Sequence, residues 1–231
     1  MAVVPWRDPF PVRCTENSIP EVSVPRGRPP QRTRTQVVAA AIAVADAEGL
    51  DALTMRRLAA ELGAGVMSLY TYVRDKDDLV DQMVDQISAV DPEWAGGDLL
   101  DLVRWQRELM LRHPWLPAAL PNRQLTGENT LGHLERGLAA LAPTGLPGAA
   151  KMEILALLTG FVGSYVTHEL AQARAGITDP ERIAAQVAQL RAAVASGAYP
   201  ELARVLAENA PAAQPSFDSI ARRMINGLLN G

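Results

Sequence analysis

The amino-acid sequence predicts an all-α protein, and three observations support that fold class. Apolar residues make up 48% of the chain and aromatic residues only 5%, and the apolar excess is mostly Ala, Leu and Val, a balance that favours helices over strands. Beyond residue 33, apolar residues recur at the spacing of a helix face. Glycine, proline and capping residues divide these stretches into segments, and none of the segments has the alternation of a strand.

Composition also excludes several classes of protein. A length of 231 residues fits one or two domains. The single cysteine, Cys14, excludes an internal disulfide framework and a Cys-x-x-Cys metal site. The chain lacks an uninterrupted apolar run of about 18 residues, so no membrane partner is expected. Its first residues lack the basic start and apolar stretch of a secretory signal, and we therefore expect a cytoplasmic protein.

Residues 1–33 are expected to form a disordered, proline-rich basic arm, because they hold seven prolines and no periodic apolar face. A first helix is then predicted over residues 34–48. Val37, Ala41 and Val44 share one face of it, and Gly49 is its expected stop.

The next predicted helices are short and closely spaced. Thr54 is a good N-cap for a second helix, which ends at the glycine turn 63–65. A short third helix is expected to run to about Tyr72. Asp75 caps a fourth helix, in which Asp78 is expected to reach back in a capping-box arrangement.

The rest of the chain is also predicted to be helical, with the longest helix over residues 149–175. Four other predicted helices cover 99–113, 180–196, a short stretch from Pro200, and 216–229. A further helix is predicted between the first two, where Leu131, Leu134, Leu138 and Leu141 are in phase. A short turn is expected at 115–120 and a polar loop at 121–127.

The segment 54–73 has the anatomy of a helix-turn-helix. On its third helix an apolar side, with Val66 and Leu69, can pack against the first two helices. The outward residues are Met67, Ser68 and Thr71, with Tyr70 and Tyr72 on the flanks. A recognition helix in the major groove needs this partition. The alternative is a small helical bundle that never touches DNA, since glycine turns of this kind occur there as well.

Charge is distributed unevenly along the chain. Residues 26–76 have a net charge of +3, whereas residues 77–231 have a net charge of −6. A basic segment joined to an acidic body suggests that one end of the protein faces an anion, and the phosphate backbone of DNA is one such anion.

Three stretches, in order, resemble the DNA-binding domain of the TetR family of bacterial transcriptional regulators. They are RTQVVAAAI from Arg34, EGLDALTMRRLAAELG from Glu48 and SLYTYVRDKDDL from Ser68. The resemblance implies a domain over residues 34–80 with double-stranded operator DNA as its partner. The positions that it implies for DNA contact are Thr54, Met55, Arg56, Val66, Met67, Ser68, Tyr70, Thr71, Tyr72 and Lys76.

One departure from the family pattern concerns base recognition. Val66 and Met67 replace the polar or proline residues common at those positions. They can contact a thymine methyl group but cannot form a bidentate hydrogen bond, so this helix does not indicate the operator sequence.

The N-terminal arm gives a second hypothesis for DNA contact. Arg26 and Arg28 flank a glycine between prolines, in a stretch that resembles the core of an AT-hook. An extended basic arm fits a narrow A·T minor groove, where the negative potential is concentrated. The alternative is a solvated basic linker. In either case Arg26, Arg28, Arg32 and Arg34 are expected to strengthen the attraction to phosphate.

Residues 81–231 are expected to form a helical regulatory and dimerisation domain. Residues 91–231 resemble the tetracycline-repressor-like C-terminal domain, at motifs such as His113-Pro-Trp-Leu and Leu158-Thr-Gly-Phe. The resemblance implies a homodimer built from the long helix and the last helix. The expected interface residues are Ala156, Gly160, Gly163, Ser164, Phe217, Ile220, Met224 and Leu228. The alternative is that one monomer buries both helices.

The resemblance also implies a cavity for a small-molecule effector. The candidate lining residues are aromatic, leucine and polar side chains: Trp105, Leu109, His113, Trp115, Asn122, Asn129, Leu134, Leu138, Phe161, Tyr165 and His168. The loop 121–127 lacks the histidine with which tetracycline repressors hold a magnesium-bound drug. We therefore expect an apolar or amphipathic effector, and neither a metal nor a cofactor.

Two other functions, an enzyme and a helical binding protein without DNA, are alternatives to a transcriptional regulator. An enzyme is not expected, because the chain has neither a glycine-rich phosphate loop nor an HExxH or GxSxG motif. A helical ligand-binding or interaction protein without sequence-specific DNA binding would leave the outward face of the third helix unexplained. The favoured interpretation is a homodimeric, ligand-responsive repressor, which binds a near-palindromic operator, lies at the nucleoid when bound and is released by a small molecule.

Overall fold

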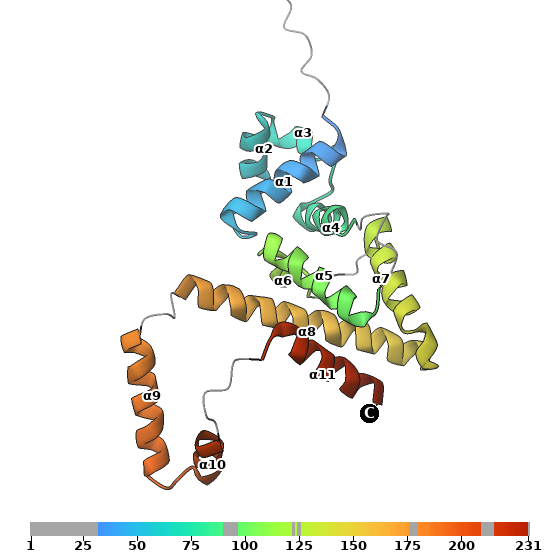
Figure 1. The fold of residues 1–231 in the computed structure, drawn as a ribbon. Coiled ribbons are helices and arrows are strands. Elements are labelled where there is room, and N and C mark those ends of the chain that lie inside the picture. The colour runs from blue at the N-terminus through green and yellow to red at the C-terminus, as the bar shows by residue number, and fades with distance from the viewer. Residues whose placement is uncertain are drawn as a thin grey trace, which may run out of the picture. The chain divides into compact units, whose positions relative to one another are not determined.

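The computed structural model describes residues 32–89, 97–121, 123, 126–175, 180–208 and 215–230. All secondary structure in these ranges is helical (Figure 1), so the predicted all-α fold is confirmed. The expected N-terminal arm, with Arg26 and Arg28, lies outside the described residues, as does Asn122.

The described helices follow the order predicted from the sequence. They are α1 (Arg34–Glu48), α2 (Met55–Leu62), α3 (Val66–Leu69), α4 (Lys76–Ile87), α5 (Leu99–Arg112), α6 (Leu116–Ala119), α7 (Glu128–Ala140), the 3₁₀ helix η1 (Ala142–Thr144), α8 (Gly148–Ala175), α9 (Pro180–Ala195), α10 (Pro200–Glu208) and α11 (Phe217–Asn230). The helix α4 runs without interruption through residue 80, where the boundary between the two domains was expected.

Side-chain caps fix the starts of the first helices. Thr33 and Gln36 form a reciprocal capping box at the start of α1, with bonds of 3.2 and 2.9 Å. At the start of α2, Thr54 Oγ1 accepts the N–H of Arg57 at 3.0 Å, as the sequence predicts. The helix α2 ends at Gly63, whose φ of 56° lies in the left-handed region that glycine adopts at low cost. This glycine sets the direction of the turn into α3.

The helix α3 is shorter than predicted. It ends at Leu69, three residues before the expected end at Tyr72. From there the chain tightens, because the N–H groups of Thr71 and Tyr72 bond to carbonyls only three residues back. Leu69 and Val73 are buried, at 1% and 3% exposure, so the predicted apolar underside is preserved.

The cap of α4 differs slightly from the expected capping box. The carboxylate of Asp75 accepts the N–H of Asp78 at 2.8 Å, as predicted. The carboxylate of Asp78 then accepts the N–H of Arg74 at 2.7 Å, one residue before the position that a capping box requires. This backbone hydrogen bond is the main reason why the pKa of Asp78 is lowered.

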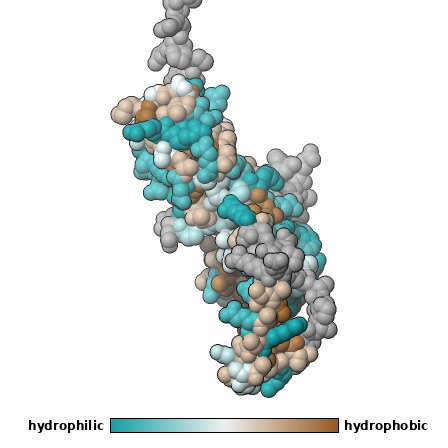
Figure 2. Space-filling view, turned by 90° about the vertical axis from the view of Figure 1, so that its left-hand side faces the viewer, coloured by the Kyte–Doolittle hydropathy of each residue, from teal (hydrophilic) through white to brown (hydrophobic). Residues whose placement is uncertain are grey.

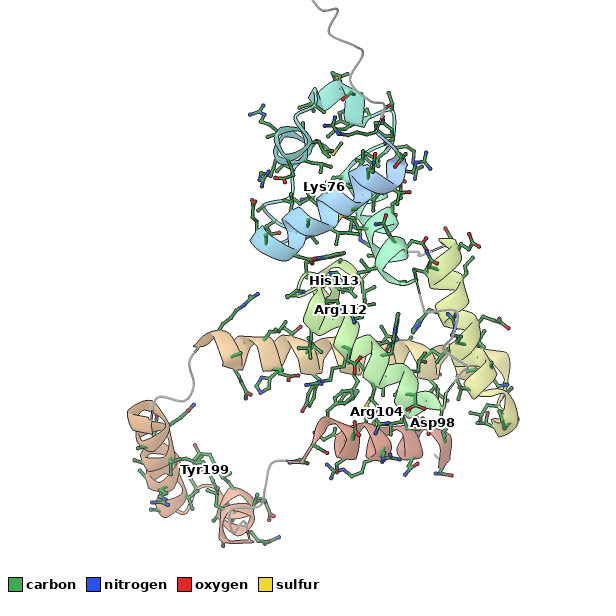
Figure 3. The ribbon with its side chains drawn as sticks, turned by 45° about the horizontal axis from the view of Figure 1, so that its top comes forward. Lys76, Asp98, Arg104, Arg112, His113 and Tyr199 are labelled. Atoms are coloured by element: carbon green, nitrogen blue, oxygen red, sulfur yellow. The ribbon has the colours of Figure 1, made fainter. Side chains whose placement is uncertain are left out.

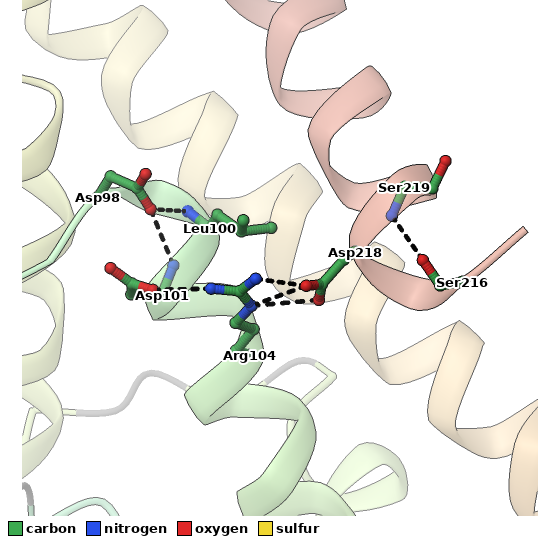
Figure 4. Close-up of polar contacts among 7 residues, drawn as sticks. All are labelled: Asp98, Leu100, Asp101, Arg104, Ser216, Asp218 and Ser219. Atoms are coloured by element: carbon green, nitrogen blue, oxygen red, sulfur yellow. Dashed lines mark hydrogen bonds and ion pairs between the residues drawn. The ribbon is translucent and has the colours of Figure 1, made fainter.

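The C-terminal helices form a core around α5 and α8, which have an extensive contact. Leu158, Val162 and Val166 of α8 are at most 1% exposed, and Val103 of α5 is fully buried. The helix α11 packs against α5 through Phe217, Ala221 and Ile225. Figure 4 shows how Arg104 of α5 joins Asp101 on its own helix to Asp218 of α11. This pairing lowers the pKa of Asp218.

The helix α8 is long and apolar enough, by length and composition alone, to cross a membrane. Its apolar stripe, however, faces the protein core, where Ile154 and Leu158 are 5% and 1% exposed. Polar side chains such as Thr167 and His168 occupy its exposed side. Packing within the helical body therefore accounts for part of the apolar composition of this helix, while Met152 and Leu157 stay exposed.

A polar contact joins α1 to the end of α5. The carboxylate of Asp46 on α1 lies 2.8 Å from His113 Nδ1, and the same oxygen accepts the indole N–H of Trp115 at 2.7 Å. His113 and Trp115 are buried, and His113 lies at the end of α5 (Figure 3). One carboxylate on the first helix therefore holds two side chains from the segment between α5 and α6.

The glycine turn provides a test of the fold. The variant Gly63→Ala is expected to lower the free energy of unfolding by about 1–2 kcal/mol, because a Cβ is strained at positive φ. Gly148→Ala is a matched control, since it lies in a helix without positive φ and has open space around it. Urea denaturation would measure both, and an equal stability of the two variants would contradict the role assigned to Gly63.

Candidate functional site

The outward face of α3 and of the turn after it is exposed. The Met67 side chain is 79% exposed and Tyr70 is 46% exposed, unusual values for large apolar and aromatic residues in a folded protein. Ser68 and Thr71 are also exposed, whereas Val66 and Tyr72 pack partly against the core. The structure thus separates the residues of this segment as its sequence predicts, except that Tyr72 is half-buried.

The two hydroxyl groups on this face already donate their hydrogens to the backbone. Ser68 Oγ donates to the carbonyl of Gly65, and Thr71 Oγ1 donates to the carbonyl of Ser68, both at 2.6 Å. In this arrangement each hydroxyl keeps its lone pairs free to accept. The face therefore offers acceptors for amino groups together with the apolar side chain of Met67.

Two adjacent arginines on α2 have different surroundings. Arg57 is bound by Glu48 at 2.6 Å and by Glu61 at 2.9 Å, so its charge is already neutralised within the domain. Arg56 is exposed and has no ion pair or side-chain hydrogen bond among the described residues. The neighbouring Thr54 hydroxyl caps the helix and is exposed, while Met55 is half-buried against the core. Arg56 is thus the cation at the start of α2 that is free to bind an external anion.

The remaining cations that were predicted to contact DNA lie on either side of this segment. Lys76, at the start of α4, is exposed and its Nζ donates to the carbonyl of Leu50 at 3.2 Å (Figure 3). Arg34 is exposed at the start of α1. Figure 2 shows a face of the molecule on which hydrophilic and hydrophobic side chains of the described residues are mixed.

The C-terminal helices and the end of α4 line a half-open hollow of about 220 Å³, which we call the inner cavity. Its lining residues are mostly apolar: Val84, Ser88, Trp105, Gln106, Leu109, Met110, Leu116, Leu120, Thr130, His133, Leu134 and Thr159. None of these side chains is a carboxylate, a lysine or an arginine. A cavity of this composition suits an apolar molecule with a few polar groups.

A larger outer groove of about 750 Å³ lies next to the inner cavity, over α8 and α6. The two hollows share five lining residues: Gln106, Leu120, His133, Leu134 and Thr159. Arg123 lines the groove and is, among the described lining residues, the one with a permanent charge. The shared residues therefore form the wall between an open groove and a smaller, apolar chamber.

Three polar side chains in this wall are bonded to one another, and we call them the polar triad. Gln106 Nε2 lies 2.9 Å from His133 Nε2 and 3.1 Å from Thr159 Oγ1. His133 also stacks on Trp105, with ring centroids 4.7 Å apart. Burial lowers the pKa of His133 to about 4, so its imidazole is neutral at physiological pH.

Some of the residues predicted to line a ligand site lie on these hollows. Trp105, Leu109 and Leu134 line the inner cavity. The others are engaged elsewhere: His113 and Trp115 bind Asp46, and Asn129 donates to Asp85 at 3.2 Å. Four further candidates lie apart from the lining. Phe161 and Tyr165 pack on Phe217, and Leu138 packs on the core. His168 is exposed beside Gln172.

Sequence reasoning missed Gln106, His133 and Thr159. They belong to three different helices, 27 and 53 residues from Gln106 along the chain, so no local spacing relates them. A weak signal was present for Thr159, because it is a polar residue within the apolar stretch 154–162 of a predicted helix. Such a residue requires a partner when its helix is buried.

Contacts from α4 reach the cavity and the segment before α7. Val84 and Ser88 of α4 line the inner cavity. Asp85 accepts the N–H of Thr130 at 3.0 Å. Arg123 bonds to Asp81 at 2.6 Å and to Asp77 at 2.9 Å. The helix α4, which follows the exposed face of α3, therefore contacts lining residues of both hollows.

The residues expected at a dimer interface have mixed exposure. On α8, Ala156, Gly160 and Ser164 are exposed and line the outer groove together with Gly163, which is half-buried. On α11, Phe217 is 8% exposed and packs within the chain. Ile220, Met224 and Leu228 are half-buried in a row along the flank of α11. Leu157, on the outer side of α8, is 44% exposed.

The chain is similar to known proteins over most of its length. Residues 37–83 match the family described as bacterial regulatory proteins, tetR family, and residues 91–230 match the tetracyclin repressor-like, C-terminal domain. The HTH-type transcriptional repressor DrrR1 of Streptomyces coeruleorubidus is 37% identical over 217 residues, covering 88% of this chain and 79% of that protein. An HTH-type transcriptional regulator of Saccharopolyspora erythraea is 31% identical over 209 residues, covering 86% and 85%.

The chain is also similar to a solved structure. The TetR family protein ActR of Streptomyces coelicolor, in complex with actinorhodin, superposes with a TM-score of 0.66 at 28% sequence identity. The superposition covers 86% of this chain and 97% of that one. The similarity therefore extends over both the N-terminal and the C-terminal helices.

Burial of His133 predicts a pH dependence of stability. An unfolded histidine binds a proton near pH 6.5 and the folded one only near pH 4, so between these values the unfolded state binds more protons. The free energy of unfolding is expected to fall as the pH is lowered from 6.5 to 4, with a slope that approaches about 1.4 kcal/mol per pH unit. His133→Gln should reduce the slope by the contribution of His133, and His168→Gln, at an exposed site, should keep it. Denaturation at several pH values would measure it, and an unchanged slope in His133→Gln would refute the assignment.

Proposed function

We propose, since this chain belongs to the TetR family of bacterial transcriptional regulators, that it represses transcription as a homodimer on a near-palindromic operator and is released by a small molecule. The predicted resemblance to the family is confirmed by the two family matches and by the related repressor. Members of this family act by binding DNA rather than by catalysis. We also propose the homodimer, the residues that contact DNA and the release from DNA by a small molecule.

The observation that supports DNA binding most strongly is the exposure of the α3 face. Met67 and Tyr70 have no partner in the core, and burial of such side chains on DNA removes apolar surface from water. Met67 offers contact to a thymine methyl, and Ser68 and Thr71 offer acceptors to the amino groups of adenine or cytosine. Arg56, Lys76 and Arg34 supply cations for phosphate, which position the helix without reading sequence.

The proposed dimer uses the exposed side of α8 and the flank of α11. Leu157, Gly160 and Ser164 are exposed at helical spacing on α8, and Ile220 and Met224 lie half-buried on α11. The added Cβ of a side chain at Gly160 would meet open space within the monomer. A small residue on an exposed helix face permits a second helix to approach closely, which supports a four-helix seam between two copies.

The proposed release depends on α4. Its side chains line the inner cavity, and its carboxylates hold Arg123 and Thr130. A molecule in the cavity that prefers one position of α4 would change the placement of α3 in each copy, and so the spacing of the two recognition helices. Only a ligand with different affinities for the two states can do this. ActR, the structural relative described above, has been solved with actinorhodin bound, which supports a small molecule as the effector.

Selection of DNA fragments by the full-length protein tests the function. The protein would be incubated with a genomic library without effector, and the bound fragments sequenced. An enriched near-palindromic site with half-sites about 34–36 Å apart, or a multiple of that, is the expected result. If no fragment is enriched even at low ionic strength, the protein does not act as proposed.

The two arginines of α2 provide a matched pair for the DNA contacts. Arg56→Ala is expected to weaken binding to the selected site and to reduce the slope of log affinity against log salt by about one, because one phosphate contact is lost. Arg57→Ala should leave that slope close to wild type, because Glu48 and Glu61 already neutralise Arg57. Fluorescence anisotropy at several salt concentrations would measure both. Equal slopes in the two variants would remove Arg56 from the contact set.

Gly160 provides a test of the dimer. Gly160→Arg is expected to convert the protein to a monomer without unfolding it, because a Cβ at this position meets open space in one copy, whereas an arginine does not fit in a closely packed seam. Gly148→Arg, which also has open space, is the control and should remain dimeric. Sedimentation velocity with circular dichroism would separate dissociation from unfolding. A dimeric Gly160→Arg would place the interface elsewhere.

A further inference from the structure

We propose that Met67 makes DNA binding depend on methyl groups at C5 of the pyrimidines in each half-site. A half-site is then bound more tightly when thymine or 5-methylcytosine, rather than cytosine, lies against this side chain. This dependence rests on the proposed function, because it requires that α3 enters the major groove of DNA. It makes the methylation of cytosines in the operator an input to regulation.

Met67 is the most exposed large apolar side chain among the described residues, at 79%. Its neighbour Val66 packs partly against the core, whereas Ser68 is exposed. A single exposed apolar residue is common on protein surfaces. This one, however, lies on the short helix between Arg56 of α2 and Lys76 of α4, the cations proposed to bind phosphate. In the major groove its side chain would therefore face the edges of bases.

The segment 64–73 has no side chain that reads a base through two hydrogen bonds. Its sequence, AGVMSLYTYV, contains no Arg, Lys, Asn or Gln, the side chains that bind guanine or adenine in that way. The next residue, Arg74, is paired with Asp78 at 3.6 Å. Tyr70 and Tyr72 each carry one hydroxyl. Base recognition by this segment therefore depends on single contacts.

The exposed hydroxyls of α3 and its turn favour an amino group of a base over a carbonyl. Ser68 Oγ donates to the carbonyl of Gly65, and Thr71 Oγ1 donates to the carbonyl of Ser68, both at 2.6 Å. Donation to guanine would break one of these bonds, whereas acceptance from an amino group keeps both. Adenine and cytosine each present an amino group in the major groove. The hydroxyls therefore accept from an A·T pair as well as from a C·G pair.

The methyl group at C5 is the apolar feature that separates these two pairs in the major groove. Thymine carries it, and unmethylated cytosine has a hydrogen there. Contact between this methyl group and the side chain of Met67 removes apolar surface of both from water. Methylation of cytosine supplies the same group beside an amino group. A 5-methylcytosine therefore satisfies both kinds of contact that this face offers.

The first test removes single methyl groups from the site enriched in the fragment selection. Each thymine is replaced in turn by deoxyuridine, which lacks only the methyl group, at equivalent positions of both half-sites. Fluorescence anisotropy of the full-length protein is expected to show, at one contacted position, binding about fourfold weaker per half-site, the factor for one methyl group that loses its contact. Thymines outside the half-sites are the control and should be insensitive. If no replacement weakens binding, the proposal is wrong.

The second test places cytosine at the sensitive position. Exchange of the T·A pair for C·G is expected to weaken binding. Methylation of that cytosine at C5 should then strengthen binding by about fourfold per half-site, because it restores the methyl contact. The last two duplexes differ only in the methyl group. Equal affinities for them, or weaker binding of the methylated duplex, would overturn the proposed response to methylation.

A variant of Met67 assigns the effect to this side chain. Met67→Ala should bind the thymine and uracil duplexes equally, and the cytosine and 5-methylcytosine duplexes equally. Met152→Ala is the matched control, because Met152 is also exposed, at 46%, but lies on α8 and should keep both differences. Circular dichroism would confirm that both variants are folded. Differences that persist in Met67→Ala would contradict the role of Met67.

The outcomes distinguish this dependence from the proposed function. If no DNA fragment is enriched at all, the proposed function fails and the methyl dependence fails with it. An enriched site whose affinity is the same with and without every C5 methyl group would refute the methyl dependence and leave the proposed function standing.

Discussion

The burial of α4 on two sides is the constraint on which the rest of the structure depends. Leu79, Val80, Met83 and Val84 are at most 1% exposed, and α4 contacts α1, α6 and α7. A close-packed helix of this kind has no free space in which to deform, so a change on one side moves the helix as a unit. The same helix begins next to the exposed face of α3 and ends against the inner cavity. The proposed DNA-contacting face and the proposed ligand cavity therefore share one rigid element.

The acidic side chains of α4 form polar contacts with other parts of the protein. The carboxylates of Asp77 and Asp81 face Arg123, and Asp85 accepts from Thr130 in the first turn of α7. These bonds use the acidic residues of α4 within the protein instead of presenting them to DNA. The internal pairing of Arg57 has the opposite effect, because it removes a cation from the surface. The net charge of a sequence segment therefore does not indicate which of its charged side chains are free to bind an external partner.

The sequence predicted the helices and their caps well, because the signals for them are local. Thr54 and Gly63 act as cap and stop within a few residues of the groups that they satisfy. The length of α3 was overestimated, because the backbone tightens after Leu69 while the apolar pattern continues to Val73. Periodicity does not distinguish a helix from a helical turn that keeps the same phase.

The ligand-facing residues were less predictable, because they depend on contacts between helices. Of the aromatic residues that the sequence predicts as lining, Trp105 lines the cavity, whereas Phe161 and Tyr165 pack on Phe217. Gln106 and His133, which were not predicted, also lie in the cavity wall. Burying an amide, an imidazole and a hydroxyl in an apolar wall is costly unless they bind one another, and they do so only in part. A core that served stability alone would have apolar residues at these positions. The bonding of these three side chains depends on the packing of three helices, and no local spacing in the sequence could predict it.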